Sequence, residues 1–191
     1  MHLTKKIKIA IVGTHVSGKT SLCYEVVAEL KKQNLRADVA REASRLSYYL
    51  AADIRNFEMQ LDLLTRHVSE ELESLRTSDI VICDRSVIDV WAYTQNLPRE
   101  NLSKKEIAYI KSMEKFIQFY IDSYDIIFRK NTFYDVQDST DPLLVGSSDF
   151  QQKILDDINR YIEDKNIEVI DIQEDNSKNQ ILESIISLWN S

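Results

Sequence analysis

The feature that most constrains the fold of this chain is a pair of glycines at the end of a short apolar run. The run IKIAIV, residues 7–12, leads directly into GTHVSGKTSL, residues 13–22. The chain has only three glycines in 191 residues, and two of them, Gly13 and Gly18, lie in this segment. Glycine permits backbone conformations and close approaches that side chains prevent. Its placement here therefore predicts a backbone of defined shape after a buried strand.

The segment from Gly13 to Thr20 matches G-x-x-x-x-G-K-S/T, the pattern of a phosphate-binding loop between a strand and a helix. In such a loop Lys19 reaches the β and γ oxygens of ATP, and the Thr20 hydroxyl ligates Mg²⁺. The alternative is a chance match in an ordinary strand–turn–helix. His15 occupies a variable position of the pattern, and we interpret its side chain as incidental. The expected nucleotide-binding residues are Gly13, Thr14, His15, Val16, Ser17, Gly18, Lys19, Thr20 and Ser21.

Composition restricts the class of protein. Apolar residues make up 43% of the chain and charged residues 29%, which is typical of a folded domain, and the length predicts one domain over residues 1–191. A net charge of −7 argues against a broad cationic surface for nucleic acid or an anionic membrane. No apolar run reaches the length of a membrane span. Two cysteines, Cys23 and Cys83, are too few for a disulfide framework, which favours buried, reduced thiols and a cytoplasmic location.

Short runs rich in Ile and Val alternate with helical patterns along the chain. Apolar runs without strict alternation are typical of strands buried on both faces of a parallel sheet. Strands are expected at 7–12, 79–84, 124–128 and 167–172, with a weaker candidate at 36–40. Helices are expected at 19–32, 56–76, 103–121, 149–165 and 177–189. In the second of these, a 3.6-residue apolar period predicts a buried face formed by Phe57, Leu61, Leu64, Val68, Leu72 and Leu75. This alternation predicts an α/β fold with a parallel sheet and right-handed crossovers.

An acidic residue and an arginine follow the expected strand 79–84. Asp84 lies at the strand end, where a carboxylate that orients Mg²⁺ is needed, and Arg85 would face the cleft where ligands bind in such sheets. A planar guanidinium suits a phosphoryl group in transfer. The alternative is a surface arginine before a helix, because Ser86 and Asp89 have the spacing of a capping box.

Three segments together resemble a known family. GTHVSGKT, the segment REASR at 41–45 and the run VICDRSVIDVWAY at 81–93 resemble the P-loop kinases related to thymidylate kinase, deoxynucleoside kinases and nicotinamide riboside kinase. The chain is most similar to the small AAA-labelled ATPase/kinase group within that set. The likeness covers the whole chain in layout and about a quarter of it in motifs. It implies a three-layer P-loop NTPase fold, adenylate-kinase-like, with strand order 2-3-1-4-5, helices on both faces and a lid at about 131–148.

The resemblance also implies roles for four residues. Glu42 would bind the acceptor and act as a general base, and Arg45 would hold the acceptor or a phosphate. Asp84 and Arg85 match the acidic residue and arginine of the family. For Glu42 and Arg45 the alternative is an ordinary solvated ion pair.

The expected lid departs from the family pattern because residues 131–152 contain no Lys or Arg. Arg129 and Arg160, on either side of this segment, are the candidates to supply the missing cation to the substrate. Otherwise the acceptor carries less negative charge, which favours an acceptor without a phosphate. An acidic loop that is merely solvated is the third alternative. The acidic residues of the segment are Asp135, Asp138, Asp141 and Asp149.

These observations predict an ATP-dependent kinase that uses Mg²⁺ and phosphorylates a small acceptor, a nucleoside or nucleotide. The alternative is a nucleoside-triphosphate hydrolase or a regulatory nucleotide-binding protein. The chain lacks the Asn-Lys-x-Asp and Asp-x-x-Gly motifs of a GTP switch. The expected catalytic residues are Lys19, Arg85, Glu42 and Asp84, and a homodimer is left open as the assembly.

Overall fold

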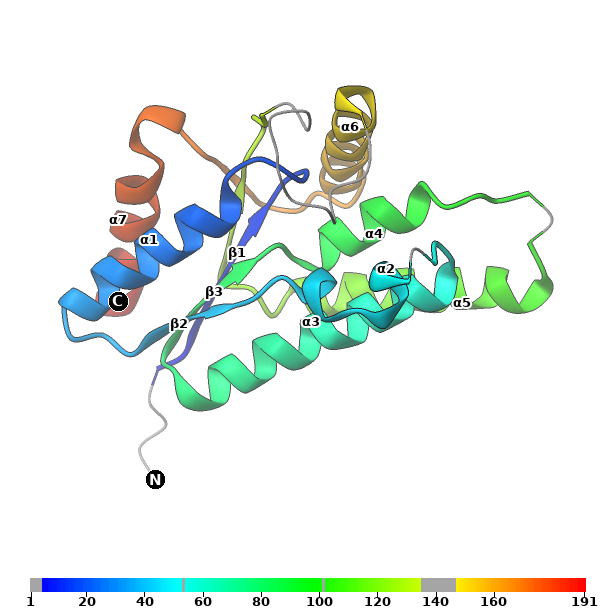
Figure 1. Cartoon of the computed structure of the whole chain (residues 1–191). Helices are drawn as coiled ribbons and strands as arrows, with labels where there is room; N and C mark the ends of the chain where they lie inside the picture. Colours follow the sequence, from blue (N-terminus) through cyan, green and yellow to red (C-terminus); the bar gives the residue numbers. More distant parts are fainter. Residues whose placement is uncertain (1–4, 53, 101, 135–146) are drawn as a thin grey trace.

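A parallel sheet of five strands forms the centre of the computed structural model, which describes residues 5–52, 54–100, 102–134 and 147–191 (Figure 1). The strand order is β2-β3-β1-β4-β5, as the family resemblance predicted. All neighbouring strands are parallel, so their carboxyl ends lie at one edge of the sheet. The strands are β1 Ile7–Val12, β2 Ala37–Ala40, β3 Ile80–Asp84, β4 Ile126–Arg129 and β5 Ile170–Asp171.

Helices cover both faces of the sheet, which makes the fold a three-layer α/β structure. In the described part of the chain, α1 and α7 pack on one face, and α3, α4, α5 and α6 lie on the other (Figure 1). The helices are α1 Lys19–Lys32, α2 Tyr48–Ala51, α3 Phe57–Thr77, α4 Val87–Gln95, α5 Lys104–Ile121, α6 Ser148–Asp164 and α7 Ser177–Asn190, with two 3-10 turns, η1 Ala43–Leu46 and η3 Glu174–Asn176. Of the lid expected at 131–148, residues 135–146 lie outside the described residues.

Strand β1 shows how the sheet serves both layers. Ile7, Ile9 and Ile11 pack toward α1 and α7, whereas Ala10 and Val12 pack toward the layer of α3 and α4. Successive side chains of a strand point to opposite faces, so every position of this strand is buried. This explains why the run, apart from Lys8, reads as apolar rather than alternating.

Local capping signals set where two helices of the second layer begin. The Ser86 hydroxyl accepts a hydrogen bond from the Ile88 amide, and the Asp89 carboxylate accepts one from the Ser86 amide. Ser103 and Glu106 form the same reciprocal arrangement at the start of α5. The capping box that the spacing of Ser86 and Asp89 predicted is therefore present.

Helix α3 corrects one part of the sequence prediction. The apolar residues Leu61 and Leu72, expected on the buried face, are 41% and 57% exposed. The buried face of α3 instead carries several polar side chains, because it packs on a buried polar cluster and on a cavity. Its buried residues are Phe57, Met59, Gln60, Leu64, His67, Glu71 and Ser74.

The buried polar cluster is centred on Glu71, whose side chain is fully inaccessible. Its carboxylate accepts hydrogen bonds from Lys8 Nζ at 2.9 Å and from the hydroxyls of Tyr120 and Tyr124, both at 2.7 Å. His67 Nε2 lies 3.0 Å from the same carboxylate. Burial alone would raise the pKa of Glu71, but His67 and Lys8 together lower it to about 2. The cluster therefore holds a charged pair inside the core, linking β1, α3 and α5.

The state of the two cysteines and the hydropathy of the helices were both expected from the composition. Cys23 and Cys83 are both buried and unpaired, as predicted. Across the described ranges, no helix combines the length and the hydropathy needed to cross a membrane.

We predict that Glu71→Leu destabilises the protein by about 3–5 kcal/mol, because it leaves the buried Lys8 ammonium without its counter-charge. Chemical denaturation of the purified variant measures this loss. The matched control is the double variant Lys8→Met/Glu71→Leu, which removes both charges and should recover most of the lost stability. A single variant as stable as the wild type would contradict the prediction.

Candidate active site

The loop between β1 and α1 has the backbone geometry that its glycines predicted. Gly13 has φ +151°, and a Cβ placed there would lie 2.6 Å from the Lys130 carbonyl oxygen at the end of β4. Gly18 has φ +76° and precedes the first residue of α1, Lys19. No side chain fits at Gly13, and Gly18 adopts the left-handed conformation that side chains disfavour. The loop amides are therefore presented at the helix N-terminus, where anions bind.

Neighbouring elements hold this loop in place. The Gly13 amide donates to Asp89 Oδ1 at 3.1 Å, which ties the loop to α4. The Tyr134 amide donates to the Val16 carbonyl at 2.8 Å. Gln151 Nε2 donates to the His15 carbonyl at 3.0 Å, which ties the loop to α6. The loop is thus fixed from three sides.

Lys19 lies inside the loop with its ammonium on loop oxygens. Its Nζ donates to Ser17 Oγ at 2.8 Å and to the Thr14 carbonyl oxygen. Burial, with a smaller contribution from the Arg85 charge, lowers the pKa of Lys19 to about 8. A phosphate oxygen beside this ammonium would favour its charged form, so the position suits an anionic ligand.

Thr20 and Asp84 form the second element of the site. The Thr20 hydroxyl donates to Asp84 Oδ2 at 2.6 Å, which joins the start of α1 to the end of β3. Burial raises the pKa of Asp84. A hydroxyl and a carboxylate are hard oxygen donors of the kind that Mg²⁺ prefers, and Mg²⁺ is commonly held by one or two such groups plus phosphates and water. The pair therefore fits the predicted Mg²⁺ ligands, although the described residues hold no cluster of three or more His, Cys, Asp or Glu side chains arranged for a metal.

Arg85 follows Asp84 in a backbone conformation that is rare for a side-chain-bearing residue, with φ +85°. Its Nε donates to Glu42 Oε1 at 2.6 Å, and its Nη1 lies 3.8 Å from Asp89 Oδ1. Its guanidinium carbon is 5.6 Å from the centre of the Tyr93 ring. Nη1 is buried and, among the described residues, has no hydrogen-bond partner. Strained backbone of this kind persists where surrounding contacts enforce it, often at functional sites.

Glu42 precedes the turn η1 and faces Arg85. Burial alone would raise the pKa of Glu42, but the charge of Arg85, a hydrogen bond from Ser44 and the charge of Lys19 lower it to about 2. Glu42 is therefore a fixed carboxylate at neutral pH. Among the described side chains, the ion-pair partner of Glu42 is Arg85. The side chain of Arg45 lies outside the described residues, so the alternative of a solvated Glu42–Arg45 ion pair stays untested.

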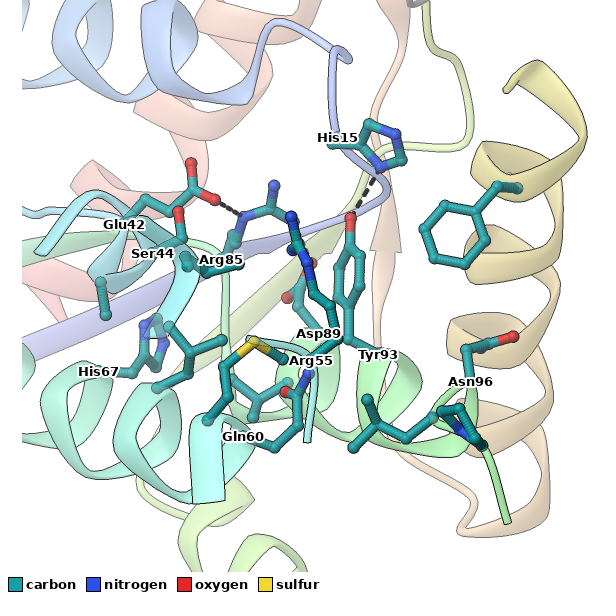
Figure 2. Close-up of a pocket in the computed structure, with 18 residues that line it drawn as sticks. His15, Glu42, Ser44, Arg55, Gln60, His67, Arg85, Asp89, Tyr93 and Asn96 are labelled. Atoms are coloured by element: carbon teal, nitrogen blue, oxygen red, sulfur yellow. Dashed lines mark hydrogen bonds and ion pairs between the residues drawn. The ribbon is translucent and has the colours of Figure 1, made fainter. Parts of the chain in front are cut away.

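A cavity of about 330 Å³ opens beside the Arg85–Glu42 pair (Figure 2). Two arginines, two carboxylates and two histidines contribute charged or titratable groups, and four neutral polar residues and eight apolar residues complete the wall. Figure 2 shows side chains of this wall converging from η1, α3, α4 and the loop after β1, which carries His15, and α6 contributes Phe150. The lining residues are His15, Glu42, Ala43, Ser44, Leu50, Arg55, Met59, Gln60, Leu63, His67, Arg85, Asp89, Val90, Tyr93, Asn96, Leu97, Pro98 and Phe150.

The two arginines proposed from sequence to replace a lid cation lie elsewhere. Arg129 pairs with Asp171 at 2.7 Å and donates to Asn159 Oδ1 at 3.2 Å. Arg160 pairs with Asp157 at 2.8 Å and lines a second cavity, between α4, α5 and α6. Neither lines the cavity beside Arg85, so their contact with a substrate stays a prediction without support from the geometry.

Several residues of the cavity were not singled out from the sequence. Arg55 lies between α2 and α3 and carries no motif that would have marked it. Gln60 and His67 are seven residues apart, so they lie on one face of α3. Leu64, between them, is buried on the same face. Polar residues at helical spacing from a buried leucine could have indicated a polar buried face, but apolar periodicity does not detect them.

The fold and the site together define a P-loop NTPase of the kinase type. The phosphate loop follows the central strand β1, and the Asp84–Arg85 pair follows the adjacent β3 in a sheet of order 2-3-1-4-5. The chain belongs to the AAA domain family, whose profile matches residues 8–177. No curated protein matches the chain.

Solved structures share this fold at low sequence identity. The NadR protein in complex with NAD and AMP-PNP is similar with a TM-score of 0.69 and 14% identity, over 97% of this chain and 50% of that chain. The chain therefore spans about half the length of NadR. The deoxyadenosine kinase of M. mycoides with bound dCTP is similar with a TM-score of 0.65 and 18% identity, over 96% of this chain and 99% of that chain. These likenesses confirm the P-loop kinase fold that the motifs predicted.

We predict that Asp84→Asn weakens the binding of Mg²⁺ with AMP-PNP by about tenfold or more, because an amide is a poorer ligand for a hard cation than a carboxylate. Isothermal titration with and without Mg²⁺ measures the effect, which should vanish in EDTA. Asp79→Asn, just before the other end of the same strand, is the matched control and should bind as the wild type does. Equal Mg²⁺ dependence in both variants would exclude Asp84 as a ligand.

Proposed function

We propose that the protein is an ATP-dependent kinase that transfers the γ-phosphoryl group to a hydroxyl of a nucleoside-like acceptor. The observation that carries the proposal is the position of Arg85. It follows Asp84, which contacts the Thr20 hydroxyl of the phosphate loop, and it pairs with Glu42 in the wall of the cavity. One guanidinium therefore lies between the place for the donor phosphates and the place for the acceptor.

On the donor side, the loop amides and Lys19 would hold the phosphates. Thr20 and Asp84 would hold Mg²⁺, which, when bound, neutralises charge on the β and γ phosphates. Arg85 would place its guanidinium on the phosphoryl group as it leaves the donor. Fixed charges of this kind stabilise charge that develops during transfer and cost no reorganisation.

On the acceptor side, Glu42 would accept a hydrogen bond from the reacting hydroxyl. Its low pKa makes it a weak base, and phosphoryl transfer through a loose transition state requires positioning more than strong base catalysis. We therefore assign Glu42 first to orientation of the hydroxyl and only second to proton transfer.

The cavity supports a flat, uncharged acceptor. Its volume of about 330 Å³ is at the small end of ligand sites. Its walls are mostly apolar. The buried Gln60 Oε1 has no hydrogen-bond partner among the described residues and is available to a heterocyclic ring, whereas the Asn96 amide nitrogen already donates to the Ala92 carbonyl and to Asp157. Arg55 and Arg85 are balanced by Glu42 and Asp89, so the described wall offers no excess positive charge for a phosphate. A nucleoside therefore fits better than a nucleoside monophosphate.

A panel experiment tests the proposal. The protein with Mg²⁺ and AMP-PNP is screened by thermal shift against nucleosides, nucleoside monophosphates and sugars, since ligands raise the melting temperature by mass action. Hits are then incubated with radiolabelled ATP, and we expect a phosphorylated nucleoside as product. Release of phosphate with no phosphorylated acceptor would favour a nucleoside-triphosphate hydrolase instead.

Lys19→Ala should fold normally and lose most of the transfer activity in this assay, because its charge stabilises the γ-phosphoryl group during transfer. Circular dichroism checks the fold, and product formation checks the activity. A folded variant with wild-type turnover would remove the basis for the phosphate-loop assignment.

Arg85→Lys keeps the charge and loses the planar fork that can bridge two oxygens. We expect kcat to fall by at least about tenfold, or roughly 1.4 kcal/mol, with little change in melting temperature. Arg41→Lys, an exposed arginine near the same strand ends, serves as the control. If the melting temperature of Arg85→Lys falls sharply while kcat stays normal, Arg85 is structural.

A further inference from the structure

His15 is the one residue of the phosphate loop that also lines the acceptor cavity. All loop residues from 13 to 20 are described, and of these only His15 belongs to the cavity wall. Its side chain is 4% exposed, whereas a residue at a variable loop position with an incidental side chain would be expected to face solvent. His15 therefore lies where the donor site and the acceptor site meet.

The imidazole of His15 has a defined set of contacts. Its Nδ1 lies 2.8 Å from the Tyr93 hydroxyl, and Figure 2 shows this hydroxyl pointing from α4 toward His15. Phe150 of α6 packs beside both rings, 6.0 Å from His15 and 6.2 Å from Tyr93 between ring centres. Arg85 also lies beside Tyr93, with its guanidinium carbon 5.6 Å from the centre of the Tyr93 ring.

Both partners of the hydrogen bond are uncharged at neutral pH. Burial, followed by the charges of Arg85 and Lys19, lowers the pKa of His15 to about 4. Burial raises the pKa of the Tyr93 hydroxyl, so that group stays protonated. The pair can therefore stand beside two cations without adding a third charge to the site.

The nitrogen atoms of the Arg85 guanidinium differ in their hydrogen bonding. Glu42 engages Nε, whereas Nη1 has no hydrogen-bond partner within the described residues and lies 3.8 Å from Asp89. The guanidinium also lies over the Tyr93 ring. The quadrupole of an aromatic ring stabilises a cation in this position. The position of Tyr93 therefore affects the position of Arg85.

We infer that His15 and Tyr93 form a positioning pair that ties the phosphate loop to the wall carrying Arg85. The inference rests on the proposed function. Through the hydroxyl, Tyr93 is fixed to the loop that would hold the donor phosphates; through its ring, it supports the arginine that would bind the transferring group. The pair thereby sets the distance between donor and acceptor, and neither residue is assigned a contact with the reacting atoms.

Two substitutions separate the hydrogen bond from the packing. Tyr93→Phe keeps the ring under Arg85 and removes the hydroxyl, and His15→Leu removes the imidazole. Each should lower kcat by about tenfold while the Kd for AMP-PNP and the melting temperature change little, because a misplacement of reacting groups costs rate rather than binding. The double variant should lose no more than either single variant, since both remove one interaction.

Tyr161→Phe is the matched control, because the buried Tyr161 hydroxyl has no hydrogen-bond partner among the described residues. It should leave kcat unchanged. A readout independent of catalysis is nitrogen-15 NMR of the imidazole: the Nδ1 signal of His15 should shift in Tyr93→Phe and stay in place in Tyr161→Phe. An unchanged signal in Tyr93→Phe would show that the pair does not exist in solution and would overturn the inference.

The two proposals fail in different ways. A wild-type protein that phosphorylates no acceptor overturns the proposed function, and this inference with it. A wild-type kinase whose Tyr93→Phe and His15→Leu variants keep full kcat overturns the inference alone. Additive losses in the double variant would also overturn it, because they would show two separate roles.

Discussion

The site depends most on the interactions of one buried carboxylate, that of Asp89. One oxygen accepts the Gly13 amide at 3.1 Å, and the other accepts the Ser86 amide at 2.7 Å. The same side chain lies 3.8 Å from Arg85 Nη1. A single buried anion therefore fixes the first residue of the phosphate loop, the N-terminus of α4 and the arginine between them. Because buried charges are costly unless they are fully paired, such a group holds its partners in one arrangement.

The parts of the fold that could be predicted from sequence are those set by local patterns. Gly13 and Gly18 marked the loop because few other residues could adopt its backbone, and continuous Ile and Val runs marked the buried strands. Helix α3 could be predicted in extent and not in orientation. Its inward face is chosen by the Glu71 cluster and the cavity, whose other members come from β1 and α5, far away in the sequence. Apolar periodicity alone therefore assigned Leu61 and Leu72 to the core, where they do not lie.

The same distinction applies to the site. Asp84, Arg85 and the loop were predictable because each sits at a strand end, and parallel strands bring their ends together. Arg129 lies at such an end as well, but Asp171 on the neighbouring β5 turns its side chain away from the cavity. The direction of a side chain depends on partners that the sequence does not place. For the same reason His15 looked incidental: its partner Tyr93 lies 78 residues later and meets it only through the packing of α4.

Helix α3 connects the stability of the core with the geometry of the cavity. Gln60 and His67 line the cavity, and Glu71, one turn after His67, anchors the helix to Lys8 on β1. Strand β1 in turn ends in the phosphate loop. Strand β1 therefore contacts the same helical layer at both ends. Lys8, near its start, binds Glu71 of α3, and Gly13, in the phosphate loop after its end, binds Asp89 of α4. A purely apolar α3 could pack on this sheet as well, but it would lose these directional hydrogen bonds, which fix the rotation of the helix. The buried charges of the core thus affect the cavity, because the rotation of α3 decides which of its side chains line the wall.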